Sequence, residues 1–343
     1  MNEKLPEDVL YEVQISHLSG LGLYAVRDIP AGTLILSETA MMHHKGSERR
    51  PPGVIGLFNA LSNNDKAAYF CLPRQQDRHK HCEQTSDKHI LDIYHNNSLL
   101  IAHTSSLCLC PPDQDVSKRA PAFSRAVFRN LSLLNHSCIP NTTISFLKAN
   151  AAATPTASLR SNRAITAGEE LTISYFLLSD GRVPLSFPCR CPLCSPRVCH
   201  ARPDPGLPVL TNHISTTTIY TTLPHALHPP RTTTPTLEAA ELRAELSLKR
   251  REHLASLLTD AENSALTPAK RAKRAEDALL VMAEEGIDGV DVGRVYAILA
   301  ECHAMLGHSH QATLARKMQI TVFETCLGSN HPVTARARAL LAN

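Results

Sequence analysis

Residues 135–141 read Asn-His-Ser-Cys-Ile-Pro-Asn, and about 50 residues further on, residues 189–194 read Cys-Arg-Cys-Pro-Leu-Cys. Three thiolates at C-x-C-x-x-C spacing suit tetrahedral zinc, because a tight turn can direct them at one ion about 2.3 Å away. The single cysteine of the first stretch is the candidate fourth ligand, and it would hold its segment against the cysteine turn. The sequence therefore predicts one structural zinc bound by Cys138, Cys189, Cys191 and Cys194.

A third stretch lies between these two and ends in a tyrosine. Residues 167–175 read Ala-Gly-Glu-Glu-Leu-Thr-Ile-Ser-Tyr, and the alternation over 171–175 predicts a strand with Tyr175 at its end. By itself such a tyrosine is more often a core residue than a functional one. Glu169 and Glu170 permit an acid–base interpretation, but after Gly168 they more simply stabilise the turn before the strand.

Two glycines near the N-terminus form a further candidate. Ser19-Gly20-Leu21-Gly22-Leu23 lies between two predicted strands, so it is not the dinucleotide-binding fingerprint, which opens a helix. Glycines in such a turn let the backbone approach a ligand closely. A plain glycine-rich hairpin turn is the alternative.

Together these stretches resemble the SET-domain protein-lysine methyltransferases, whose N-H-S-C-x-P-N, G-E-E-L-x-x-x-Y and C-x-C-x-x-C motifs occur here in the family's order, from Leu18 to Cys194. The resemblance implies S-adenosylmethionine as cofactor, Tyr175 as the catalytic residue, and Phe187 beside it in the wall of the lysine channel. It also implies a zinc ligand set of Cys138 with the post-SET triad. The implied cofactor contacts are Gly20, Leu21, Gly22, Asn135 and His136.

Within the family, the SET-and-MYND type is the most similar subgroup. A long insert precedes residue 135, the cysteine triad closely follows Tyr175, and residues 327–332, Leu-Gly-Ser-Asn-His-Pro, are similar to a joint of tetratricopeptide-like repeats. The MYND zinc finger is missing, because the insert lacks paired C-x-x-C spacing. An irregular group in the insert could bind a second metal, although solvated residues are the favoured interpretation: Cys71, His79, His81, Cys82 and His89.

The chain is expected to be an α+β protein. We predict a β-rich SET domain over 1–194, with a helical insert at about 45–122 and a post-SET zinc element at 187–194, then a Pro/Thr-rich linker over 195–235 and an all-α, tetratricopeptide-like domain over 236–343. Strands are predicted over 11–15, 33–36, 142–146 and 171–175, an exposed loop over 149–158, and helices over 292–306 and 310–327. Leucines at 237, 242, 246, 254, 257 and 258 mark the apolar faces of the first C-terminal helices.

Composition narrows the class of protein. A net charge of +3 is too small to predict nucleic-acid binding by electrostatics, so direct nucleic-acid binding is not expected. The basic runs at 249–251 and 270–274 leave nuclear import open, although solvated helix faces are favoured. Eleven cysteines, an odd number, argue against a secreted disulfide framework, and neither a signal peptide nor a membrane span is expected. A reducing compartment, cytoplasmic and/or nuclear, follows.

The sequence thus predicts a zinc-containing enzyme that transfers methyl groups from S-adenosylmethionine to a lysine of a protein substrate. The alternative is an inactive SET-fold scaffold that recruits protein partners through its C-terminal helices. Retention of Tyr175, Asn135 and His136 favours the enzyme. Methylation of another nucleophile stays open, and no motif identifies the substrate.

Overall fold

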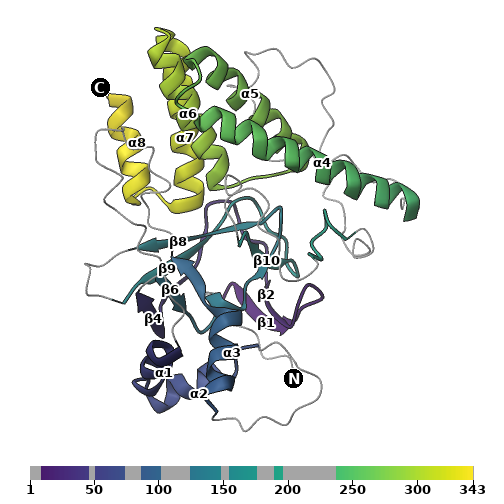
Figure 1. Ribbon diagram of the computed structural model, residues 1–343, viewed down its shortest axis with the longest axis vertical. Coiled ribbons are helices and arrows are strands. Elements are labelled where there is room, and N and C mark those ends of the chain that lie inside the picture. The colour runs from purple at the N-terminus through teal and green to yellow at the C-terminus, as the bar shows by residue number, and fades with distance from the viewer. Residues whose placement is uncertain are drawn as a thin grey trace.

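The computed structural model describes residues 9–45, 51–73, 86–101, 124–147, 154–175, 189–195 and 237–342. Figure 1 shows three tiers, with short strands in the middle and helices at both ends. The first tier holds α1 (Pro51–Asn59), α2 (Asn63–Phe70) and α3 (Asp87–Asn97). The last tier holds α4 (Leu237–Glu262), α5 (Pro268–Glu285), α6 (Val290–Met305), α7 (Ser309–Leu327) and α8 (Pro332–Ala342). The predicted α+β class, β-rich first and all-helical afterwards, is confirmed.

The middle tier consists of three small sheets, with strand orders β1-β2-β10-β7, β3-β9-β8 and β4-β6-β5. Their strands are β1 (Tyr11–Ile15), β2 (Leu21–Ala25), β3 (Leu34–Thr39), β4 (Met42–Lys45), β5 (Leu99–Ile101), β6 (Ser124–Val127), β7 (Asn135–His136), β8 (Thr142–Leu147), β9 (Thr156–Ser161) and β10 (Glu170–Ile173). The described pairings are antiparallel except β10 with β7, which is parallel. The first sheet therefore brings the 135–141 stretch beside the 167–175 stretch.

Two expectations about local structure were wrong. The exposed loop predicted over 149–158 gives way to β9 from Thr156, because Ala157 and Leu159 are buried and β9 pairs with β3 on one side and β8 on the other. The second wrong expectation concerns α4, because the leucines predicted to form its apolar face differ in burial. Leu254 is buried, whereas Leu242 and Leu246, in the first half of α4, are 58% and 44% exposed. The N-terminal end of α4 projects beyond the other helices (Figure 1).

A buried carboxylate ties the first sheet together. Glu170 opens β10 and accepts hydrogen bonds from Ser16 Oγ at 2.8 and 2.9 Å, from Tyr24 Oη at 3.0 Å and from Asn135 Nδ2 at 2.8 Å. Ser16 follows β1, Tyr24 lies in β2 and Asn135 begins β7. One side chain of β10 thus connects every other strand of its sheet, which offsets the cost of burying the charge.

Gly20 and Gly22 are needed for different reasons. A Cβ on Gly22 would lie 2.4 Å from Glu170 Oε1, so a side chain there would displace the buried carboxylate. Gly20 has a φ of 54°, a left-handed conformation, and its nearest neighbour, Pro73, would be an ordinary 3.7 Å from an added Cβ. Gly22 is therefore required because there is no space for a side chain, and Gly20 is required because its backbone is left-handed.

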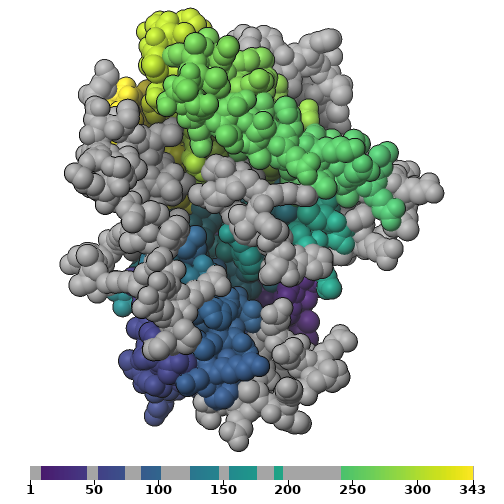
Figure 2. Space-filling model, in the orientation of Figure 1, coloured from purple at the N-terminus to yellow at the C-terminus, as the bar shows by residue number. Residues whose placement is uncertain are grey.

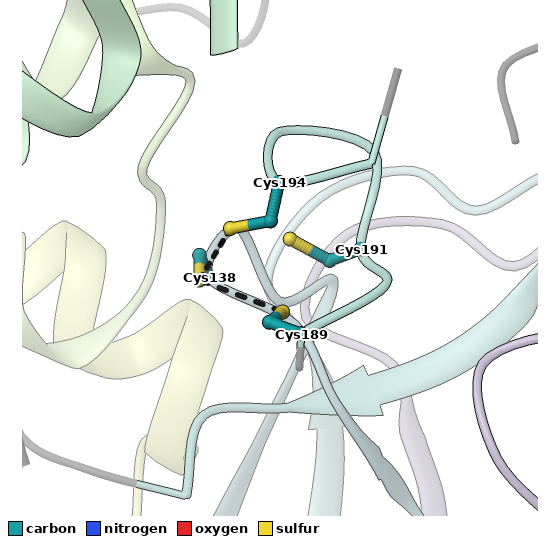
Figure 3. Close-up of side chains that lie close together, drawn as sticks. All are labelled: Cys138, Cys189, Cys191 and Cys194. Atoms are coloured by element: carbon teal, nitrogen blue, oxygen red, sulfur yellow. Dashed lines mark hydrogen bonds between the residues drawn. The ribbon is translucent and has the colours of Figure 1, made fainter. Parts of the chain in front are cut away.

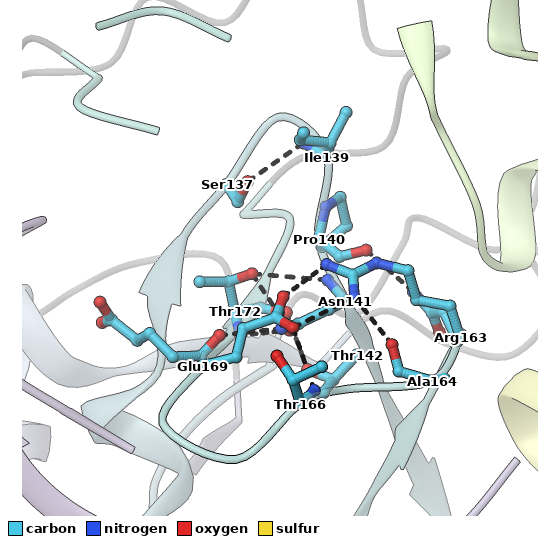
Figure 4. A network of polar contacts seen from close by, with 12 residues as sticks. Ser137, Ile139, Pro140, Asn141, Thr142, Arg163, Ala164, Thr166, Glu169 and Thr172 are labelled. Atoms are coloured by element: carbon cyan, nitrogen blue, oxygen red, sulfur yellow. Dashed lines mark hydrogen bonds and ion pairs between the residues drawn. The ribbon is translucent and has the colours of Figure 1, made fainter. Parts of the chain in front are cut away.

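A second polar network holds the 135–141 stretch against β10 (Figure 4). Asn141 Nδ2 donates to the Glu170 carbonyl at 2.8 Å, and its Oδ1 accepts from the Thr172 amide at 2.8 Å. Glu169, on the other side of the strand from Glu170, pairs with Arg163 at 2.5 Å and accepts from Asn141 Nδ2 at 3.0 Å. The structure agrees with the expectation that Glu169 stabilises the turn before the strand.

The C-terminal helices pack as successive neighbours, α4 on α5, α5 on α6, α6 on α7 and α7 on α8. They enclose two clusters of buried hydrophobic residues, both separate from the core of the sheets. The helical region also reaches the sheets, since α7 packs against β8 and β9. In the space-filling view α4 lies directly above the strand tier (Figure 2). Within the described part of the chain, none of the helices combines the length and apolar character that a bilayer crossing requires.

Gly22→Ala should destabilise the protein more than Gly20→Ala. The first change drives a methyl group into a buried carboxylate, which costs about 1–3 kcal/mol. The second introduces only a strained backbone, at about 1 kcal/mol. Thermal unfolding of the two variants beside wild type measures this order, and a Gly22→Ala variant as stable as Gly20→Ala would contradict the role given to Glu170.

His331 predicts a pH dependence of stability in the helical region. It is 3% exposed, its Nδ1 accepts from the Val333 amide at 3.3 Å at the start of α8, and burial lowers its pKa. The unfolded chain therefore binds this proton more readily, so the stability that neutral His331 provides is complete above the ordinary histidine pKa of about 6.5 and is lost as pH falls towards the folded pKa.

His331→Asn keeps a side-chain acceptor at the start of α8 but removes the titrating group. We expect its melting temperature to fall less than that of wild type between about pH 7.5 and pH 5.5, while part of the slope persists because burial also lowers the pKa of His303. His310→Asn, at an exposed position, is the matched control and should keep the wild-type slope. Equal slopes for all three proteins would exclude His331 as a source.

Candidate active site and metal centre

The parallel pairing of β7 with β10 builds the site. Asn135 lies opposite Thr172 and His136 opposite Ile173, and the Ser137 amide then donates to the Ile173 carbonyl at 3.0 Å. Tyr175 follows two residues after β10 ends, in a bend rather than at the end of the strand as predicted. The two stretches therefore deliver Asn135, His136 and Tyr175 to one place.

Asn135 connects this place to the glycine turn. Its Nδ2 lies 3.1 Å from the Ser19 carbonyl, 3.0 Å from the Leu21 carbonyl and 2.8 Å from Glu170 Oε1. The residue is 8% exposed. The amide nitrogen is thus used by the protein itself, and Asn135 orients the turn that contains Gly20, Leu21 and Gly22.

His136 lies between the tyrosine and the cysteines. Its Nδ1 accepts from the Tyr175 amide at 3.2 Å, so the ring proton belongs on Nε2, which is 3.5 Å from Cys138 Sγ. Burial lowers its pKa and keeps the ring neutral. The ring centroids of His136 and Tyr175 are 5.3 Å apart. The His136 ring therefore contacts both Tyr175 and the cysteine cluster.

Tyr175 presents a neutral phenol. Although 41% of the residue is exposed, its hydroxyl is turned inward and donates to the Leu134 carbonyl at 2.8 Å. Burial of the hydroxyl and the nearby charge of Glu170 raise the pKa of Tyr175 to about 12. The phenol therefore keeps its proton at neutral pH, and a phenol oxygen can accept hydrogen bonds while it donates one.

The four predicted cysteines converge (Figure 3). Cys138 Sγ lies 3.9 Å from Cys189 Sγ and 3.7 Å from Cys194 Sγ, and all four sulfurs lie within 4.8 Å of one another. A tetrahedral zinc with Zn–S bonds of about 2.3 Å would separate its sulfurs by about 3.8 Å. The donor set and the spacing both fit a structural zinc, and among the described residues this is the one group of its kind.

The protonation of the cysteines also suits a cation. Hydrogen bonds from Cys138 and Cys189 lower the pKa of Cys194 to about 7, whereas those shared with Cys189, Cys191 and Cys194 raise the pKa of Cys138. Four thiols this close cannot all ionise unless a cation compensates them. All seven cysteines of the described residues are free thiols.

Other candidates from the sequence do not reach this site. Phe187 and the insert residues His79, His81 and Cys82 lie outside the described residues. Cys71 is exposed, and His89 is buried with its ring centroid 5.3 Å from that of Phe70. No metal group forms around these two among the described residues.

Sequence reasoning missed two participants. The Leu134 carbonyl orients the Tyr175 hydroxyl. Because every residue type has a main-chain carbonyl, the sequence cannot indicate this partner. Arg251 of α4 donates from Nη2 to Cys194 Sγ at 3.4 Å. Its only signal was membership of the basic run 249–251.

Comparisons with known proteins found similarity in the first half of the chain. Residues 20–176 match the family described as the SET domain. Among solved structures 72 chains match, one of them a candidate histone methyltransferase of Plasmodium falciparum with 14% identity and a TM-score of 0.25, covering 48% of this chain and 92% of its own. No curated protein matches. The β-rich N-terminal half of this chain, with the 135–141 and 167–175 stretches paired at its centre, therefore has the fold class expected of a SET domain.

Proposed function

We propose that this protein transfers methyl groups from S-adenosylmethionine to the side-chain amine of a lysine in a protein substrate. SET domains are generally protein-lysine methyltransferases, and residues 20–176 form one. The observation that carries the proposal is that two consecutive residues contact both ends of the site, because Asn135 donates to the glycine turn and His136 accepts from the Tyr175 amide. These are the residues whose types and order the family uses for cofactor and lysine.

When bound, S-adenosylmethionine supplies an electrophilic methyl group on a sulfonium. The Gly20 turn is the proposed place for its amino-acid end, since the turn is exposed and Asn135 holds its carbonyls in one orientation. A lysine amine, with an ordinary pKa of about 10.4, must lose its proton before it can attack. Tyr175 stays neutral, and with its proton donated to Leu134 its oxygen can accept from the incoming amine and align it.

We also propose that Cys138, Cys189, Cys191 and Cys194 hold one structural zinc in a post-SET element. Zinc would fasten the cysteine turn to the segment that carries His136, and through the Nδ1 contact to Tyr175. The SET-and-MYND type without its finger is the proposed subgroup, supported by the order of SET domain, cysteine turn and helical array. The odd number of cysteines, eleven, supports action in a reducing compartment, cytoplasmic and/or nuclear.

Tyr175→Phe should lower methyl transfer about 100-fold or more while S-adenosylmethionine binding stays within about threefold of wild type. The change removes one hydroxyl that aligns the reacting groups and leaves the turn intact. Label transfer from radioactive S-adenosylmethionine to proteins of a cell extract measures activity, and calorimetry measures cofactor binding. Tyr11→Phe, on the edge strand β1, is the control.

Two outcomes would contradict the proposal. Undiminished label transfer by Tyr175→Phe would exclude the role given to the hydroxyl. A wild-type protein that is folded and zinc-loaded, yet neither binds S-adenosylmethionine nor labels any protein, would instead support the scaffold interpretation.

The zinc proposal predicts about one zinc per chain by elemental analysis. Cys191→Ser should lower zinc content well below one per chain and reduce the melting temperature, because Cys191 is fully buried and metal binding contributes directly to folding. Cys71→Ser, at an exposed cysteine away from the cluster, should change neither. Wild-type zinc content in Cys191→Ser would contradict the ligand set.

A further inference from the structure

We propose that Arg251 is a positioning residue of the metal centre, through which the C-terminal helical region controls how tightly the cysteine cluster holds zinc. The inference rests on the proposed zinc site and assigns it a partner from outside the SET domain. Arg251 lies in α4, more than 50 residues after the last cysteine of the cluster. Arg251 therefore connects α4, which is distant in sequence, to the metal centre.

The geometry of Arg251 is specific. Its Nη2 donates to Cys194 Sγ at 3.4 Å, and its Nε lies 3.3 Å from the Ser247 carbonyl, one helical turn earlier in α4. The second contact holds the planar guanidinium in the orientation that the first requires. The side chain is half-buried, which limits screening by water.

The positive charge of Arg251 compensates negative charge at the metal centre. Four thiolates around one zinc leave two negative charges uncompensated, and Cys191 at the centre is fully buried. The Arg251 guanidinium brings a positive charge to this cluster, with Nη2 3.4 Å from Cys194 Sγ. A cation at this distance offsets part of the negative charge of a zinc-bound cluster and so favours the metal-bound state.

The cluster receives N–H groups from two sides. His136 Nε2 faces Cys138 Sγ from within the SET domain, and Arg251 faces Cys194 Sγ from the helical region. Outer donors of this kind orient metal ligands and tune metal affinity. An apolar contact accompanies the second donor, since Ile139, next to Cys138, packs against the core of the helices.

The neighbours of Arg251 have other partners. Lys249 pairs with Glu245 on the surface, and Arg250 pairs with the buried Glu285. Within the run 249–251, the cation that meets the cysteines is therefore Arg251. Lys249→Gln provides a matched control, because it makes the same change of charge on the same helix at an exposed side chain.

Zinc affinity of the full-length protein should be measured by competition with a colorimetric chelator. We expect Arg251→Gln to bind zinc about tenfold or more weakly than wild type. Arg251→Lys should lose less, because it keeps the charge, and Lys249→Gln should match wild type. Replacement of zinc by cobalt gives a second readout, since its thiolate charge-transfer band should shift in Arg251→Gln but not in Lys249→Gln.

Each negative result has a distinct meaning. Equal zinc affinity in Arg251→Gln, Lys249→Gln and wild type would overturn this inference and leave the zinc site standing. Arg251→Lys as weak as Arg251→Gln would overturn the charge argument. A wild-type protein that holds no zinc would overturn the proposed zinc site itself.

Discussion

The buried carboxylate of Glu170 accepts hydrogen bonds from Ser16, Tyr24 and Asn135, three residues that lie in three different strands or turns. A carboxylate this deep, 7% exposed, is stable only while its donors stay in place, so the donors are held in one geometry. Asn135 in turn holds the Ser19 and Leu21 carbonyls. The shape of the glycine turn therefore follows from the burial of one charge, and the lack of a side chain at Gly22 is what admits it.

His136, the residue after Asn135, connects the site to the metal centre. With Nδ1 accepting from the Tyr175 amide and Nε2 facing Cys138, a single ring lies between the proposed catalytic tyrosine and the cysteine cluster. A metal ion at the cluster would thus affect the proposed methyl transfer without touching the substrate. Displacement of Cys138 would move His136, and the backbone of Tyr175 would lose its acceptor.

The cysteine cluster and the α+β class could be predicted from sequence, whereas the polar partners could not. Cysteine thiolates at this spacing are typical ligands of zinc, so the sequence alone indicates that the four side chains meet around one ion. Glu169 and Glu170 are the same residue type side by side, yet Glu169 pairs with Arg163 whereas Glu170 accepts from Ser16. Residue type alone does not distinguish these partners. Glu38 likewise accepts from the backbone amides of Arg129, Asn130 and Leu131, just before β7, and main-chain donors have no residue signature.

The two basic runs, 249–251 and 270–274, show that cations adjacent in sequence need not form one positively charged surface. Successive helix residues point about 100° apart, so adjacent cations reach different neighbours. In the first run the partners are Glu245, Glu285 and the Cys194 sulfur. In the second, Arg271 is buried beside Glu301, while Lys273 and Arg274 pair with Asp277 and Asp260. The pairs of Lys249, Lys273 and Arg274 lie on the surface, whereas Arg271 is buried and Arg250 reaches a buried carboxylate. Arg251 differs from the others because its partner is a sulfur of the cysteine cluster rather than a carboxylate, and this contact joins α4 to the segment that holds Cys194.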